Sequence, residues 1–174
     1  MPCAGQIGST LVKGLAGKYH LRGLDIRPTS GLEDSVVGDV REFETVLRAA
    51  KGMNAIVHLA NVSTGAEDRW EDLVGNMTGT YNVLEAARQS GVRRVVYASR
   101  AGLLSPYPTH ITRTVDLLPR PNSFYSVGKV VGEKLACILS ILRAGWRQWQ
   151  ILGASRSRRQ LGGGSKRTTG SWNP

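Results

Sequence analysis

The stretch that decides the fold is "RWEDLVGNMTGTYNVLEAARQSGVRRVVYAS", residues 69–99. Its first part predicts a long helix over 69–91, which Gly91 is suited to end. Its last seven residues, 93–99, are mostly apolar and predict a strand buried on both faces. The helix has four side chains spaced to face inward: Leu73, Met77, Tyr81 and Leu84.

The same alternation continues on both sides of this stretch. Short apolar segments predict strands at 20–26, 35–40 and 55–60, and helical spacing is found at 41–50 and 123–139. A loop with several prolines, 101–122, precedes the last helix. Strands that alternate with helices form right-handed crossovers and a parallel sheet covered on both faces. We therefore expect an α/β protein with a Rossmann-like, doubly wound parallel sheet.

Charge divides the chain into two parts. The 174 residues carry a net charge of +10, but residues 1–136 hold 16 Lys and Arg against 13 Asp and Glu, whereas residues 137–174 hold seven Lys and Arg and no acid. After Gly145 neither a helix nor a strand period is sustained. We expect a folded domain over 1–144 and a basic tail over 145–174, which is either disordered or, as its three Trp favour, read out of frame.

Bulk composition excludes several classes of protein. No apolar run is long enough to span a membrane, and the first residues do not have the order of a signal peptide. Cys3 and Cys137 have neither metal nor redox spacing and suggest reduced thiols in the cytoplasm. Because the excess charge belongs to the tail, binding to nucleic acid is not favoured.

The first residues, "MPCAGQIGST", place Gly5 and Gly8 three apart at the start of an amphipathic helix. Glycines in such a turn allow backbone N–H groups at a helix N-terminus to approach a pyrophosphate. Two glycines alone also fit an ordinary turn that starts a helix. Asp25 closes the next strand about 20 residues later, where a carboxylate accepts hydrogen bonds from a ribose, or where it is simply solvated.

Three further residues are candidates for binding or catalysis. Asp39 follows the segment 35–40 and suits either an adenine contact or the N-cap of the next helix. Tyr125 and Lys129 are four apart on the predicted helix 123–139, so they share a face. An ammonium beside a phenol stabilises its anion, and such a phenol can exchange protons near neutral pH.

Taken in order along residues 4–136, these motifs resemble the extended short-chain dehydrogenase/reductases, in particular the NAD-dependent epimerase/dehydratase family and its uronate-dehydrogenase-like members. The resemblance rests on "AGQIGSTLVKGLAG" (4–17), "LDIR" (24–27), "VVGDVRE" (36–42), "AIVHLAN" (55–61), residues 76–99 and "LLPRPNSFYSVGKVVGEKLA" (117–136). It implies NAD as cofactor, with NADP disfavoured by Asp25, and hydride transfer to or from a carbon of a sugar or sugar acid.

The resemblance also implies roles for individual residues. Tyr125 would be the acid/base, Lys129 would hold the nicotinamide ribose, and Asn76 would support that lysine. The residues expected to contact the cofactor are Gly5, Gln6, Ile7, Gly8, Asp25, Asp39, Val40, Leu59, Ala60, Asn61, Tyr125 and Lys129. His58 is expected to be a core residue and not a ligand. A homodimer through helices 69–91 and 123–139 is a further implication.

The sequence departs from the family at three places. Arg100 stands where the family has a catalytic Ser or Thr, with Ser99 one residue earlier. The family's first strand and its C-terminal substrate lobe are not recognisable, so we expect an incomplete sheet. Whether the chain is an active enzyme is therefore open: the alternative is a non-catalytic fragment, truncated or frameshifted, that retains weak nucleotide binding.

Overall fold

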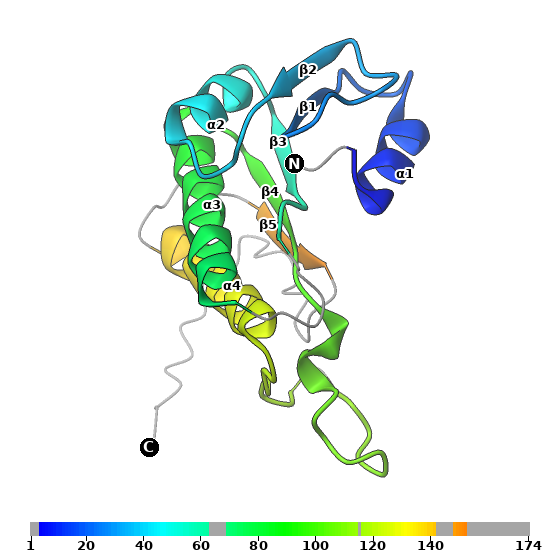
Figure 1. The fold of residues 1–174 in the computed structure, drawn as a ribbon, viewed down its shortest axis with the longest axis vertical. Coiled ribbons are helices and arrows are strands. Elements are labelled where there is room, and N and C mark those ends of the chain that lie inside the picture. The colour runs from blue at the N-terminus through cyan, green and yellow to red at the C-terminus, as the bar shows by residue number, and fades with distance from the viewer. Residues whose placement is uncertain (1–3, 63–68, 115, 142–147, 153–174) are drawn as a thin grey trace, which may run out of the picture.

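A computed structural model describes residues 4–62, 69–114, 116–141 and 148–152 (Figure 1). Four α-helices and five strands alternate along it: α1 (Gln6–Leu15), β1 (Arg22–Asp25), β2 (Asp34–Val37), α2 (Phe43–Ala50), β3 (Ala55–His58), α3 (Trp70–Gln89), β4 (Arg94–Ala98), α4 (Phe124–Ile141) and β5 (Gln148–Leu152). A short 3₁₀ helix, Ala101–Leu104, follows β4. In Figure 1, α1 lies on one side of the strands, and α2, α3 and α4 lie on the other.

All strand pairs are parallel, as the alternation predicts. β1 pairs with β2, and β3, β4 and β5 form a second sheet in that order. The expected Rossmann-like architecture is confirmed. Within the described residues the sheet is incomplete, because the segments 22–25 and 55–58 lie in separate sheets. The expected strands over 20–26, 35–40 and 55–60 are each shorter in the structure.

The core lies where α3 crosses β3 and β4. Val83, Leu84, Ala86 and Ala87 of α3 are at most 3% exposed, and they belong to one apolar cluster with Ile56 and Val95 of the strands. Burial of such side chains contributes about 1.5–3 kcal/mol each for the larger ones. Small residues let α3 approach its neighbours: a Cβ at Gly79 would lie 2.7 Å from Cγ2 of Val40.

Helix α3 differs at one side chain from the helix that the sequence predicts over 69–91. Leu73 and Leu84 are buried as predicted, but Tyr81 is 49% exposed. The Tyr81 side chain is amphipathic and can remain partly exposed to solvent. The inward-facing position is taken by the neighbouring Thr80, which is 2% exposed. Gly91 takes a left-handed φ of 68° just after the helix, which suits a residue without a Cβ.

β5 departs from the expectation that regular structure is not sustained after Gly145. Its residues Gln148–Leu152 pair in parallel with Arg94–Ala98 of β4. The sequence "QWQIL" alternates polar and apolar residues, which is the strand period, but five residues are too few to stand out from an irregular surrounding. Other residues expected in the tail lie outside the described residues.

Candidate active site

The candidate active site lies at the carboxyl end of β4, where α4 begins. Tyr125 and Lys129 share a face of α4, and the Lys129 Nζ lies 5.5 Å from the centroid of the Tyr125 ring. The same Nζ donates a hydrogen bond of 2.7 Å to the carbonyl oxygen of Ala98, the last residue of β4. The lysine therefore ties the helix to the strand end and holds its charge beside the phenol.

Lys129 is buried, with 2% of its surface exposed. Burial penalises the charged ammonium and lowers the pKa of Lys129 to about 8. Its Nζ also lies 5.2 Å from the centroid of the Tyr97 ring, whose π-electrons attract a cation. At neutral pH the group is thus still largely protonated, but it is poised to titrate in the mildly alkaline range.

Arg100 supplies a second cation at the same place. Its Cζ lies 5.3 Å from the centroid of the Tyr125 ring, and its Nη1 donates a 3.0 Å hydrogen bond to Oγ of Ser126, which is fully buried. Among the residues that the structure describes, Arg100 has no ion-pair partner. The arginine thus occupies the space next to the phenol.

Ser99, expected as a possible substitute for that hydroxyl, is directed elsewhere. Its Oγ donates to Oε1 of Glu133 at 2.5 Å, one turn beyond Lys129 on α4. Sequence reasoning missed Glu133, although its spacing of four from Lys129 places it on the face that carries Tyr125. Ser99 and Arg100 therefore contact different turns of α4. Of the two, Arg100 is the one beside Tyr125.

The structure brings the glycine turn and Asp25 together. Gly5 is the N-cap of α1, and the N–H of Ala4 just before it donates a 3.0 Å hydrogen bond to Oδ2 of Asp25. Asp25 ends β1, is 5% exposed, and accepts a second bond from the N–H of Arg27. Gln6, Ile7 and Gly8 form the first turn of α1, whose N–H groups have no acceptor within the helix.

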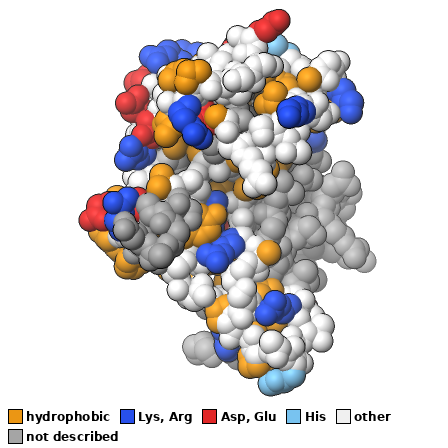
Figure 2. Space-filling model, turned by 45° about the vertical axis from the view of Figure 1, so that its right-hand side comes forward, with side chains coloured by type: hydrophobic (Ala, Val, Ile, Leu, Met, Phe, Trp, Pro, Cys, Tyr) orange, Lys and Arg blue, Asp and Glu red, His pale blue; other side chains and the backbone are white. Residues whose placement is uncertain are grey.

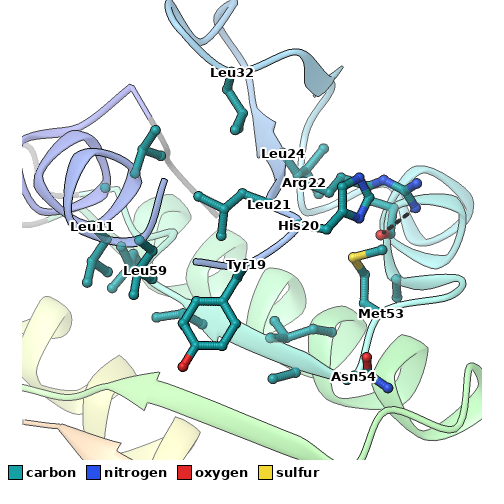
Figure 3. Close-up of a pocket in the computed structure, with 18 of the residues that line it drawn as sticks. Leu11, Tyr19, His20, Leu21, Arg22, Leu24, Leu32, Met53, Asn54 and Leu59 are labelled. Carbon is teal, nitrogen blue, oxygen red and sulfur yellow. Dashed lines mark hydrogen bonds between the residues drawn. The ribbon is translucent and has the colours of Figure 1, made fainter. Parts of the chain in front are cut away.

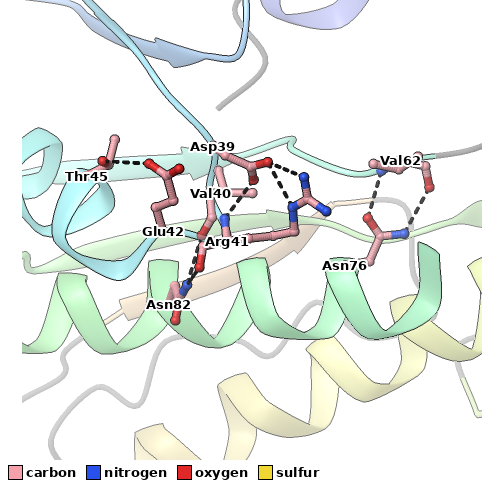
Figure 4. A network of polar contacts seen from close by, with 8 residues as sticks. All are labelled: Asp39, Val40, Arg41, Glu42, Thr45, Val62, Asn76 and Asn82. Carbon is pink, nitrogen blue, oxygen red and sulfur yellow. Dashed lines mark hydrogen bonds and ion pairs between the residues drawn. The ribbon is translucent and has the colours of Figure 1, made fainter. Parts of the chain in front are cut away.

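Asp39 does not cap α2. The N-cap is Glu42, and the Asp39 carboxylate instead accepts hydrogen bonds from the backbone and guanidinium N–H groups of Arg41 (Figure 4). This pairing holds the pKa of the Asp39 carboxyl below its usual value. The N-cap alternative is wrong because Asp39 closes a tight turn on Arg41, one turn ahead of the helix.

Two asparagines of α3 hold the loops that follow β2 and β3 (Figure 4). Asn76 accepts a 2.7 Å bond from the N–H of Val62 and donates a 2.9 Å bond to the same residue's carbonyl. Asn82 donates to the carbonyls of Val40 and Arg41. The contacts of Asn76 are thus with the loop after β3, in which Leu59, Ala60 and Asn61 lie half-buried.

His58 lies in the core, as expected. It is 1% exposed, and its Nε2 is 3.2 Å from Oγ1 of Thr80. Burial lowers the pKa of the imidazole well below its usual value. The ring is therefore a neutral packing residue beside Tyr97, with ring centroids 5.6 Å apart.

The described residues on the face shown in Figure 2 form no continuous basic patch. On the side seen in Figure 2, Lys and Arg side chains lie apart from one another, with uncharged and acidic groups between them. Within the described residues, none of the helices combines the length and the apolar character that crossing a membrane requires.

The chain is similar in sequence to known proteins. The model of the NAD dependent epimerase/dehydratase family matches residues 3–140. The L-arabinose 1-dehydrogenase (NAD(P)(+)) of Haloferax volcanii is 33% identical over 145 residues, covering 76% of this chain and 56% of that protein. The uronate dehydrogenase of Pseudomonas syringae pv. tomato is 32% identical over 139 residues, covering 76% of this chain and 50% of that protein.

Solved structures of this family are similar to the chain as well. A short-chain dehydrogenase/reductase superfamily protein from Agrobacterium tumefaciens, solved with bound NAD, superposes with a TM-score of 0.75 and 33% identity. The match covers 86% of this chain and 46% of that one. The chain thus spans about half the length of the curated relatives it matches.

Proposed function

The chain belongs to the NAD-dependent epimerase/dehydratase family, and on that premise we propose that it is the NAD-binding part of an oxidoreductase or epimerase acting on a sugar or sugar acid. The observation that carries the proposal is the cluster at the end of β4. There Tyr125 lies within 5.5 Å of two cationic groups, those of Lys129 and Arg100. A phenol that moves a proton needs such stabilisation of its anion.

The residues present fit NAD. The first turn of α1 offers backbone N–H groups suited to a pyrophosphate. Asp25, held beside this turn by the Ala4 N–H, offers a carboxylate for the ribose hydroxyls. Its negative charge opposes the extra phosphate of NADP. The half-buried loop residues Leu59, Ala60 and Asn61, fixed by Asn76 through Val62, would line the cofactor's path toward Tyr125.

The positions of the chain's own side chains support specific roles in this proposal. Bound NAD would supply the hydride acceptor or donor. The Tyr125 hydroxyl would give or take the proton of the substrate hydroxyl. Lys129, fixed by its bond to Ala98, would keep a positive charge beside Tyr125 and reach toward the nicotinamide ribose.

Arg100 bears on the class of substrate. A guanidinium without an ion-pair partner among the described residues offers the paired donors that suit a carboxylate. We therefore favour a sugar acid over a neutral sugar. The same residue favours the second candidate, a nucleotide-binding protein with weak or no turnover, because it fills the place of the hydroxyl that would hold the substrate oxygen.

Titration calorimetry with NAD, followed by NADH production with a panel of uronates and neutral sugars, tests the proposal. Binding of NAD with slow oxidation of uronates is the expected result. Binding without any turnover would select the second candidate. If NAD does not bind to a folded chain, both candidates are wrong.

The proposal includes a homodimer through α3 and α4. Trp70, Val74 and Tyr81 lie on one face of α3 and are 44–59% exposed, and the Trp70 ring packs against that of Phe124 of α4. An apolar strip of this kind across two packed helices suits a second copy. Light scattering of the wild type and of Tyr81→Glu tests it: the variant should be monomeric at concentrations where the wild type is dimeric.

A further inference from the structure

Three consecutive residues at the carboxyl end of β4, Ala98, Ser99 and Arg100, are each bonded to a different residue of α4. We propose that the middle bond, from Ser99 to Glu133, is a positioning contact that fixes the peptide group holding the ammonium of Lys129. Any part that this contact plays in a reaction rests on the proposed function, but its effect on Lys129 does not.

The peptide group between Ala98 and Ser99 carries the carbonyl oxygen that accepts the 2.7 Å hydrogen bond from Nζ of Lys129. Because a peptide group is planar and rigid, the direction of its C=O is set by the backbone on both sides. On one side the backbone is fixed by the strand, whose pairing with β5 extends to Ala98. β4 ends there, so the other side depends on the contacts of Ser99.

The side chain of Ser99 supplies such a contact. Its Oγ donates to Oε1 of Glu133 at 2.5 Å, a length typical of a hydroxyl bonded to a carboxylate. Charge-assisted bonds of this kind are about twice as strong as neutral ones. Glu133 is half-buried, so water competes less for its carboxylate than it would at the surface. The bond therefore ties the backbone just after β4 to the turn of α4 that follows Lys129.

The level at which α4 meets β4 is fixed next to Glu133. A Cβ at Gly132 would overlap the hydroxyl of Tyr97, so the lack of a side chain at Gly132 lets the helix lie against the strand. The centroid of the Tyr97 ring in turn lies 5.2 Å from Nζ of Lys129. Of the two contacts that the ammonium makes with β4, this aromatic one is thus held at Gly132 and the carbonyl is held through Glu133.

Loss of the bond between Ser99 and Glu133 should release the ammonium. The carbonyl of Ala98 would be free to turn, and Lys129, which is 2% exposed, would lose the acceptor that compensates its burial. An ammonium on a long flexible stem then moves toward water, where it is better solvated. The pKa of Lys129 in the folded chain would approach its usual value.

The titratable neighbours of the ammonium are Tyr97 and His58 on the strands and Tyr125 and Glu133 on α4. Burial raises the pKa of Tyr97 and lowers the pKa of His58 well below its usual value, so both stay neutral from pH 7 to about 9.5. Lys129→Met removes the ammonium and keeps an apolar stem. The difference between a chain with Lys129 and the same chain with Met there therefore isolates the titration of the lysine.

Urea unfolding at several pH values, without NAD, tests the positioning role. In the wild type, relative to Lys129→Met, the unfolding constant should fall about 30-fold from about pH 7 to 9.5, because the pKa of Lys129 is about 8 when folded and near 10.5 when unfolded. Glu133→Ala and Ser99→Ala should each reduce this fall to about threefold or less, and the double variant should do no more, since both remove one contact. Glu133→Gln should keep the full fall, because its amide oxygen still accepts the Ser99 hydroxyl.

Met53→Ala is the control for a general loss of stability. Met53 packs against the apolar core and lines a cavity of about 490 Å³ between the two sheets, at the end where Asn54 lies (Figure 3). This variant should unfold at lower urea and keep the whole fall with pH. A wild type without the fall, a full fall in Glu133→Ala or Ser99→Ala, or its loss in Glu133→Gln would overturn the positioning role. Because neither cofactor nor substrate is present, a chain without turnover gives the same result.

Discussion

The guanidinium of Arg100 lies 5.3 Å from the centre of the Tyr125 ring and is held there by a 3.0 Å hydrogen bond to the buried hydroxyl of Ser126. Because Ser126 is one residue after Tyr125 on α4, the arginine is anchored to the helix that carries Tyr125. A cation fixed in this way both stabilises a phenolate and repels positively charged ligands. Replacing Arg100 should therefore show whether its charge acts on the substrate or supports the binding of the cofactor.

We expect Arg100→Ser to leave NAD affinity unchanged and to alter substrate preference. Loss of a charge-assisted contact should raise the KM for a uronate by about 10- to 100-fold, while the restored hydroxyl should raise kcat for neutral sugars. Arg120→Ser is the matched control, because that arginine stacks on Tyr107 instead. If calorimetry shows that Arg100→Ser abolishes NAD binding, Arg100 supports the cofactor site and not the substrate.

Tyr125→Phe should preserve the fold and NAD binding and lose the proton transfer. The expected fall in kcat is about 10²- to 10⁴-fold, the usual contribution of a general acid/base. Tyr107→Phe serves as the control, since its hydroxyl bonds the carbonyl of Leu118 in the loop before α4. Equal loss of activity in the two variants would argue against a role for Tyr125 in the reaction.

The buried Lys129 predicts a stability that rises with pH. Its pKa is about 8 in the folded chain and near 10.5 in the unfolded one. Between these values the unfolded state binds more protons, so the free energy of unfolding increases as pH rises through this window. The gain should be on the order of 2 kcal/mol between about pH 7 and 9.5.

Urea unfolding at several pH values measures this gain, with Lys129→Met as the reference. Methionine keeps the apolar stem and removes the ammonium, so the variant should be more stable at neutral pH and lack the rise. Lys134→Met, on the exposed side of the same helix, should retain the rise. A wild type whose stability is flat over this range would show that Lys129 is better solvated than its burial indicates.

The sequence predicts the parallel architecture, because the periodicity of each segment and the order of the motifs can be read directly from the chain. It does not predict that Arg100 bonds Ser126 or that Ser99 bonds Glu133, because these contacts join a strand end to a helix 26 and 34 residues away. It also places Tyr81 inward, since helical spacing alone does not distinguish Tyr81 from its neighbour Thr80. Contacts between segments depend on packing, which the linear pattern does not encode.

The role of the loop after β3 can be tested by replacing Asn76, with Asn82 as the matched control. Each uses its amide to hold a loop, and each is buried. Replacement by Ala should cost about 1–3 kcal/mol of stability in either case. Only Asn76→Ala should also weaken NAD binding, because Val62 follows the expected cofactor contacts Leu59, Ala60 and Asn61. Equal weakening in both variants would point to a general loss of stability.

Asp25→Asn should change the choice of cofactor. The amide oxygen can still accept one backbone hydrogen bond, so the turn at Ala4 should persist, but the negative charge is lost. We expect NAD affinity to fall by about tenfold, since charge-assisted bonds to the ribose become neutral ones. Binding of NADP should fall less or improve, because Arg27 is nearby and the repulsion is gone. Calorimetry with both cofactors gives the ratio, and an unchanged ratio would mean that Asp25 serves only to fix the glycine turn.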